Sequence, residues 1–193
     1  MGLIVVRHGR TEANAAGVLL GRLDPGLDEV GKRQAAALGA AVVGAARVVT
    51  SPLRRTRETA AAFGLPITED ERWIELDYGT LDGVPLRDVP GELWSRWVSD
   101  VEFAPEGGES LAALGRRVRA ACEDVAEEAA ERDIVVVTHV SPVKAAVAWA
   151  LGVGDDVSWH LYVAPGSVTR IAVGPPRRSL HSFNSTAHLD ALA

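Results

Sequence analysis

Two histidines lie at the ends of apolar runs, beside residues that bind anions. His8 lies between Arg7 and Gly9, and His139 directly follows a second run. A neutral imidazole nitrogen is nucleophilic near pH 7, and an adjacent arginine can hold phosphate oxygens for in-line attack. Gly9 would let the backbone approach the anion and offer it an N–H group. This pattern indicates phosphoryl transfer to a histidine, although for Arg7-His8-Gly9 alone a capping histidine beside a surface arginine is the simpler explanation.

Bringing such residues together requires strands, and the chain contains three short runs rich in β-branched residues. The predicted strands are Leu3–Val6, Arg47–Thr50 and Ile134–Thr138. Their continuous apolar character is typical of strands buried on both faces of a sheet. His8, Ser51 and His139 each follow one of them, and the carboxyl ends of parallel strands form the ligand crevice of open α/β sheets. We therefore expect these three residues to converge.

Helical patterns alternate with the predicted strands. Asp28 and Ser110 can cap helices, the second running to about Glu131, and a further helix follows Pro52 and ends near Gly64. Segments 168–173 and 178–183 can add later strands. This alternation predicts an α/β fold, a three-layer α/β/α sandwich with a largely parallel central sheet.

Length and composition restrict the number of domains, the classes of partner and the cellular location that we expect. The 193 residues suit a single domain, 1–193, in which we expect 184–193 to form a surface tail. A net charge of −6 argues against a nucleic-acid or anionic membrane partner. The apolar segment at the start of the chain is too short for a signal peptide, and no stretch is long enough to span a membrane. The single cysteine excludes an internal disulfide. We therefore expect a cytoplasmic protein. The oligomeric state is left open, with a homodimer possible.

The periodic pattern weakens between residues 67 and 105. Glycines and prolines punctuate this segment, and three tryptophans, Trp73, Trp94 and Trp97, supply large apolar surfaces. We interpret it as a functional excursion with one short helix, which gives the pocket an open or apolar wall.

Four blocks of the chain resemble the histidine phosphatase superfamily, the phosphoglycerate mutase-like clan. They occur in family order and at family-like spacings over most of the chain, and the family fold is an α/β/α sandwich. The blocks are Arg7-His8-Gly9-Arg10-Thr11-Glu12-Ala13-Asn14, Ser51-Pro52-Leu53-Arg54-Arg55-Thr56-Arg57-Glu58-Thr59-Ala60, Glu75-Leu76-Asp77-Tyr78-Gly79 and Val137-Thr138-His139.

The resemblance implies three catalytic residues. His8 corresponds to the nucleophile that becomes phosphorylated. Glu75 corresponds to the acid that protonates the leaving alkoxide and later activates water. His139 corresponds to the second family histidine, which hydrogen-bonds the phosphate and stabilises charge on the transferring group.

The resemblance also implies the residues that bind substrate. Arg7 is a phosphate ligand, Arg55 matches the family arginine four residues after the serine, and Asn14 matches an asparagine near the pocket. Two departures concern the surroundings of the site: Val140 replaces the glycine that often follows the second histidine, and Leu20 replaces a frequent glutamine. These changes are expected to alter the backbone approach to phosphate and the pocket rim.

We therefore expect a phosphomonoesterase that acts on a small phosphorylated metabolite through a phosphohistidine and needs no cofactor. A cofactor-dependent phosphoglycerate mutase is the first alternative, disfavoured because mutases of this family tend to be longer. A catalytically inactive phosphate-binding module is the second. A metal site fits poorly, since arginines crowd the first two blocks and neither histidine has another histidine three or four residues away.

Overall fold

A six-stranded sheet of order β3-β2-β4-β1-β5-β6 forms the centre of the computed structural model, which describes residues 1–174 and 177–192. Strands β1 to β4 are parallel, whereas β5 pairs antiparallel with β1 and β6 pairs antiparallel with β5. The expected largely parallel sheet is confirmed. The strands are β1 (Gly2–Arg7), β2 (Arg47–Thr50), β3 (Ile67–Glu69), β4 (Ile134–Thr138), β5 (Val168–Gly174) and β6 (Arg177–Ser185).

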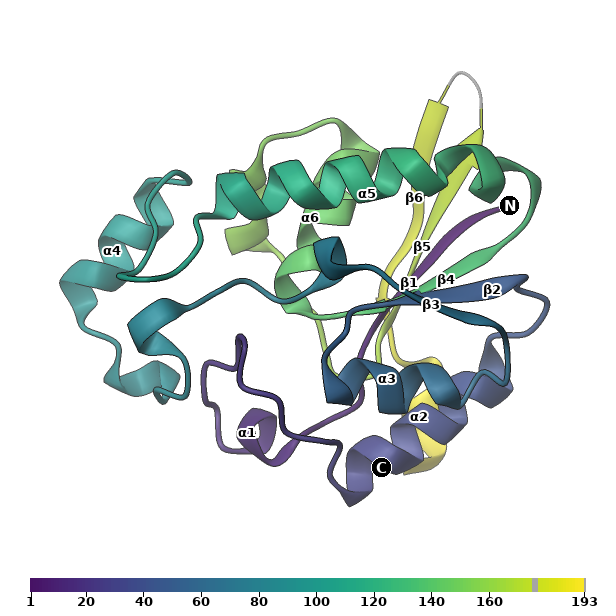
Figure 1. Ribbon diagram of the computed structural model, residues 1–193, viewed down its shortest axis with the longest axis horizontal. Coiled ribbons are helices and arrows are strands. Elements are labelled where there is room, and N and C mark those ends of the chain that lie inside the picture. The colour runs from purple at the N-terminus through teal and green to yellow at the C-terminus, as the bar shows by residue number, and fades with distance from the viewer. Residues whose placement is uncertain (175–176, 193) are drawn as a thin grey trace.

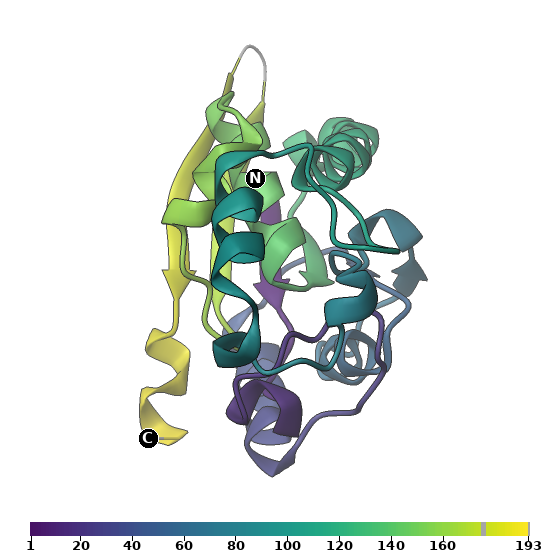
Figure 2. The same ribbon diagram turned by 90° about the vertical axis from the view of Figure 1, so that its left-hand side faces the viewer.

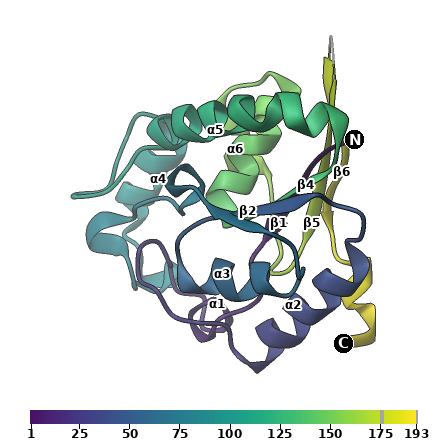
Figure 3. The ribbon, with the colours of Figure 1, turned by 45° about the vertical axis from the view of Figure 1, so that its right-hand side comes forward.

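Helices cover both faces of the sheet. Helices α2 and α3 lie on one side and α5 and α6 on the other, as Figure 1 and Figure 3 show. Asp28 caps α2 by accepting from Gly31 N at 2.7 Å, and Ser110 caps α5 by accepting from Ala113 N at 3.1 Å. The helices are α1 (Glu12–Ala15), α2 (Glu29–Ala41), α3 (Arg54–Ala61), α4 (Gly91–Ser99), α5 (Leu111–Glu131) and α6 (Val140–Leu151).

Strand β1 is buried along its whole length because it packs against both helical layers. Its alternate residues Ile4 and Val6 contact the cluster that contains Leu38 of α2, while Leu3 and Val5 belong to the cluster formed with α5 and α6. Successive side chains of a strand point to opposite faces, so a strand covered on both sides needs apolar residues at every position. The same reasoning holds for β4. Both strands end one residue after their apolar runs, at Arg7 and at Thr138.

The excursion between the first and second halves of the chain lies at the end of the molecule opposite the N-terminus (Figure 1), and α4 stands in front when that end faces the viewer (Figure 2). It contains one α-helix, as expected, together with the short 3-10 turns Glu71–Trp73, Gly79–Leu81 and Leu86–Asp88. Strand β3 was not predicted. It has three exposed residues at the sheet edge, and only its backbone pairing with β2 defines it.

The last residues lie at the surface but are not a separate tail. Asn184 and Ser185 complete β6, and Ala187–Leu192 form a 3-10 helix that packs against α2. The side-chain Oδ1 of Asn184 accepts a hydrogen bond from Ala164 N at 2.7 Å. Among the described residues, no helix has the length and apolar character to cross a membrane.

Candidate active site

The two histidines lie side by side because their strands are neighbours in register. Arg7 at the end of β1 pairs with Thr138 at the end of β4, and His8 N donates to Thr138 O at 2.9 Å. The rings of His8 and His139 have centroids 5.1 Å apart and meet edge to face. The expected convergence of these strand ends, together with Ser51 after β2, is observed.

The hydrogen bonding of His8 fixes which ring nitrogen can react. Nδ1 lies 2.6 Å from Gly9 O, and since a carbonyl only accepts, Nδ1 carries the proton. The other nitrogen, Nε2, then keeps its lone pair. The ring is 2 % exposed, and burial, followed by the charges of Arg55 and Arg7, lowers the pKa of His8 well below its ordinary value. His8 is therefore a neutral imidazole with a nucleophilic Nε2.

Gly9 has a different role from the expected one. Its N–H donates to Thr59 Oγ1 at 3.1 Å, so that group is already engaged, while its carbonyl orients His8. A Cβ at Gly9 would lie 2.5 Å from Gly31 O. Glycine is required here because the first turn of α2 packs directly against the backbone that follows His8.

His139 is held from both sides of its ring. Arg55 Nε donates to Nδ1 at 3.2 Å, so Nδ1 is the acceptor and Nε2 carries the proton that faces Ser51 Oγ at 2.8 Å. The ring is fully buried, and burial together with Arg55 and His8 lowers the pKa of His139 well below its ordinary value. His139 is thus a second neutral imidazole, positioned behind His8.

These two rings predict a dependence of stability on pH. The unfolded chain regains ordinary histidine pKa values near 6.5, whereas both folded values are lower, so between them the unfolded chain binds more protons. The free energy of unfolding should therefore fall as the pH drops below about 6.5, by up to about 1.4 kcal/mol per pH unit for each ring. Urea unfolding from about pH 7.5 to about pH 5 measures this slope.

A matched pair of variants assigns the slope to the site. His8→Asn should remove the part of the slope that one ring contributes. His181→Asn, which changes an exposed histidine of β6, should leave the slope unchanged. Equal slopes in the parent and His8→Asn would contradict the neutral assignment.

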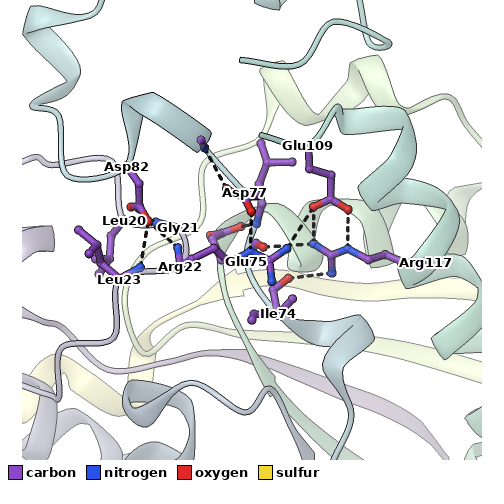
Figure 4. Close-up of polar contacts among 12 residues, drawn as sticks. Leu20, Gly21, Arg22, Leu23, Ile74, Glu75, Asp77, Asp82, Glu109 and Arg117 are labelled. Atoms are coloured by element: carbon purple, nitrogen blue, oxygen red, sulfur yellow. Dashed lines mark hydrogen bonds and ion pairs between the residues drawn. The ribbon is translucent and has the colours of Figure 1, made fainter. Parts of the chain in front are cut away.

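Arg55 joins His139 to the loop that forms one side of the site. Its NH1 donates to Leu23 O at 2.7 Å and its NH2 to Gly21 O at 2.8 Å. Asp82 also holds this loop (Figure 4), since its carboxylate accepts from the amides of residues 21, 22 and 23 at 2.7 to 2.9 Å. The loop is therefore clamped between a buried guanidinium and a carboxylate, and much of the donor capacity of Arg55 is used within the protein.

Arg7 keeps donors for a ligand. Its NH1 donates to Val163 O at 2.6 Å, but its buried Nε has no hydrogen-bond partner among the described residues. Burial is the main reason that the pKa of Arg7 falls to about 10, a value at which the group is still cationic near neutral pH. A buried cation with an unmatched donor is well suited to binding an anion.

Glu75 lies at the N-terminus of α6. Its carboxylate accepts from Leu76 N at 2.7 Å, Val140 N at 3.0 Å and Ser141 N at 3.2 Å, and the residue is 3 % exposed. Val140 follows His139 directly, so the same turn that ends β4 places both the second histidine and the donors to Glu75. Backbone donors at a helix N-terminus stabilise a negative charge.

Arg117 of α5 fixes the chain segment that carries Glu75 (Figure 4). Its guanidinium donates to the carbonyl groups of Arg72 at 2.6 Å, Ile74 at 2.8 Å and Glu75 at 3.2 Å. Two further bonds of 2.8 Å join it to the two carboxylate oxygens of Glu109. Sequence reasoning did not single out Arg117, because its partners are backbone carbonyls that no side-chain pattern reveals.

A cavity of about 260 Å³ opens in front of His8. Of the predicted site residues, Arg7, His8, Glu75 and Asn14 line it, whereas Arg55 and His139 lie behind His8 and do not. The side-chain oxygen of Asn14 accepts from Thr11 N at 3.1 Å, which leaves its amide N–H groups for a ligand.

Aromatic side chains form the outer wall of the cavity. Trp94 and Trp97 of α4 and the distant Trp159 meet one another edge to face, with ring centroids 5.5 to 6.1 Å apart. Tyr78 packs on Trp97 at 5.6 Å. The expected apolar wall is therefore present, but Trp73 is a core residue that does not reach it. Sequence reasoning also missed Trp159, which comes from a distant segment, and Lys144 of α6, which lines the same cavity.

Comparison with known proteins places the chain in a family. The model of the histidine phosphatase superfamily (branch 1) matches residues 3–186, and the chain belongs to this family. A bifunctional protein of Mycobacterium tuberculosis is 34% identical over an alignment of 177 positions, which covers 86% of this chain and 49% of that protein, so the chain spans about half the length of this relative. Phosphoserine phosphatase 1 of Hydrogenobacter thermophilus is 35% identical over an alignment of 199 positions, gaps included, which covers 97% of this chain and 93% of that protein.

A solved structure confirms the fold. A phosphoserine phosphatase from Entamoeba histolytica, a histidine-to-alanine mutant in complex with phosphoserine, superimposes with a TM-score of 0.88. The two chains are 25% identical, and the alignment covers 97% of this chain and 98% of the other. The α/β/α sandwich and the family resemblance seen in the four sequence blocks are both confirmed.

Proposed function

We propose that the protein is a phosphomonoesterase that hydrolyses a small phosphorylated metabolite through a phosphohistidine on His8. The observation that carries this proposal is a neutral imidazole whose free Nε2 lies in the same cavity as the cation Arg7 and the buried carboxyl group Glu75. Phosphatase-named relatives in the same family support it.

The first half-reaction transfers the phosphoryl group to the protein. Arg7 pairs with the non-bridging oxygens, and Nε2 of His8 attacks phosphorus in line with the ester oxygen. A P–N bond forms while the P–O bond to the alcohol breaks, and Glu75, which takes up a proton as the anionic substrate enters, gives that proton to the departing oxygen. The carbonyl of Gly9 accepts from Nδ1–H throughout and so favours the charge that the ring acquires.

The second half-reaction returns the protein to its starting state. Glu75, now ionised, removes a proton from water, whose oxygen attacks phosphorus; the P–N bond breaks and inorganic phosphate leaves. His139 and Arg55 act from behind His8, where their hydrogen bond sets the orientation of the second ring, and Arg55 keeps an N–H for the phosphate. Asn14 supplies an amide donor at the cavity wall.

Phosphate release tests this function against the alternatives. We expect the protein to liberate inorganic phosphate and 4-nitrophenol from 4-nitrophenyl phosphate, and bisphosphoglycerate should not accelerate any phosphoglycerate isomerisation. Isomerisation that exceeds hydrolysis and requires bisphosphoglycerate would instead identify a mutase. Phosphate binding without any product would identify an inactive module.

A further inference from the structure

The chain segment that carries Glu75 has no regular structure of its own. Residues 74–78 lie in neither helix nor strand, between two short 3-10 turns. The carboxylate of Glu75 is nevertheless held in one place, since it accepts hydrogen bonds from Val140 N and Ser141 N at the N-terminus of α6. The position of this carboxylate therefore depends on what fixes the irregular backbone behind it.

Arg117 uses all five of its guanidinium N–H groups within the protein. Three of them donate to the carbonyls of Arg72, Ile74 and Glu75 at 2.6, 2.8 and 3.2 Å. The other two donate to the two carboxylate oxygens of Glu109 at 2.8 Å (Figure 4). A guanidinium presents its five donors in one fixed plane, so it can bind several backbone groups at once. Arg117 keeps no N–H for a ligand, and it does not belong to the cavity lining.

Glu109 connects Arg117 to the loop that precedes α5. Its amide donates to Asp77 O at 2.9 Å, so the partner of Arg117 also bonds to the segment that carries the acid. The side chains of Arg117 and Glu109 are 18 % and 17 % exposed, which screens their attraction less than that of a surface pair. The two backbones approach so closely that a Cβ at Gly108 would lie 2.6 Å from Asp77 O. The segment is therefore fastened to the start of α5 by side chains and backbone together.

We infer that Arg117 is a positioning residue for Glu75, and that it controls proton transfer to the leaving alcohol without touching the substrate. This inference rests on the proposed function, in which Glu75 donates that proton. A general acid must lie within hydrogen-bond reach of the departing oxygen, and a displacement of about 1 Å can lower the rate about 10²-fold. Lysine cannot replace Arg117 in this role, because its donors all lie on one nitrogen.

Two esters with different leaving groups test the inference. Benzyl phosphate and 4-nitrophenyl phosphate are similar in size, but only the first releases an alkoxide that needs a proton. Because kcat/KM includes only the steps up to release of the alcohol, it isolates the half-reaction in which Glu75 is the acid. We expect Arg117→Lys to lower kcat/KM for benzyl phosphate about tenfold more than for 4-nitrophenyl phosphate, which is part of the whole contribution of a general acid.

Arg116 provides the matched control, because it precedes Arg117 in the same helix but is exposed. Its NH1 lies 3.5 Å from Glu102 Oε1, and its side chain is 63 % exposed. Arg116→Lys should leave both kcat/KM values unchanged. Glu109→Gln keeps Arg117 but removes the charge of its partner. It should change the ratio of the two values in the same direction by about threefold, since a neutral acceptor makes weaker hydrogen bonds. This second variant decides the inference if Arg117→Lys does not fold.

Two outcomes with the esters overturn the inference. Equal losses with both esters in Arg117→Lys would show that Arg117 acts on folding or on phosphate binding and not on the acid. No loss with either ester would show that Glu75 keeps its place without Arg117.

A failure of the proposed function is separate, because the parent protein would then hydrolyse neither ester. In that case NMR follows the placement of Glu75 through the amide signals of Val140 and Ser141. These signals should move in Arg117→Lys toward the positions that they take in Glu75→Gln, and they should stay in place in Arg116→Lys. Unmoved signals in Arg117→Lys would refute the inference.

Discussion

Replacing His8 with alanine is expected to lower kcat by at least about 10⁴-fold, the scale on which other enzymes respond to loss of a covalent nucleophile. The reason is that Nε2 forms the P–N bond in the proposed mechanism, and the hydrogen bond from Nδ1–H to Gly9 O leaves the lone pair on Nε2. His139 cannot substitute, because both of its ring nitrogens are engaged, by Arg55 and Ser51.

The covalent intermediate itself can be located. Rapid acid-free quenching during turnover of labelled substrate should trap an adduct that is stable to base and labile to acid. Tryptic mapping should assign it to His8, with phosphorus on Nε2 because Nδ1 is protonated. His181→Ala, at an exposed position, serves as the control and should turn over normally. Undiminished turnover in His8→Ala would refute the mechanism.

Glu75→Gln is expected to separate the two half-reactions. With alkyl phosphates, loss of the proton donor should lower kcat by about 10² to 10³-fold. With 4-nitrophenyl phosphate, whose leaving group needs no proton, phosphorylation of His8 should stay fast while hydrolysis of the phosphohistidine slows. Stopped-flow measurement should then show a burst of nitrophenolate equal to the enzyme concentration, followed by slow steady turnover.

The neighbouring acid Asp77 provides the matched control. Its Oδ1 accepts from Gly79 N at 2.9 Å, and its other oxygen lies 3.5 Å from Arg22, outside the cavity lining. Asp77→Asn should therefore show no burst and no dependence on the leaving group. Hydrolysis of alkyl phosphates by Glu75→Gln at the parental rate would remove Glu75 from the role of acid.

The sequence predicted the sheet well because burial on both faces leaves a clear signal. The apolar runs before His8 and His139 can be buried on both faces only between two helical layers. Asp28 and Ser110 mark helix starts because their side chains hydrogen-bond to nearby backbone amides. The exposed edge strand Ile67–Glu69 lacks such a signal, since backbone pairing alone defines it.

Fewer features of the site than of the sheet could be predicted, because many of its contacts join segments that are distant in the sequence. The histidines could be placed from strand ends, whereas nothing in the sequence predicted that Arg55 hydrogen-bonds loop carbonyls and His139 and lies outside the cavity lining. Arg117 acts through backbone carbonyls, which leave no pattern. Lys144 did carry a signal that was overlooked, because it is the only charged residue in the helix Val140–Leu151.

The spacing of the two histidines is set by the sheet rather than by side chains. His8 and His139 extend adjacent, registered strands, whose separation is a general property of β-structure of about 4.8 Å. The aromatic wall and Lys144, in contrast, come from α4, the segment around Trp159 and α6. Recognition of new alcohols can therefore be engineered, or can diverge in evolution, by exchanging these peripheral pieces while the reacting atoms stay in place.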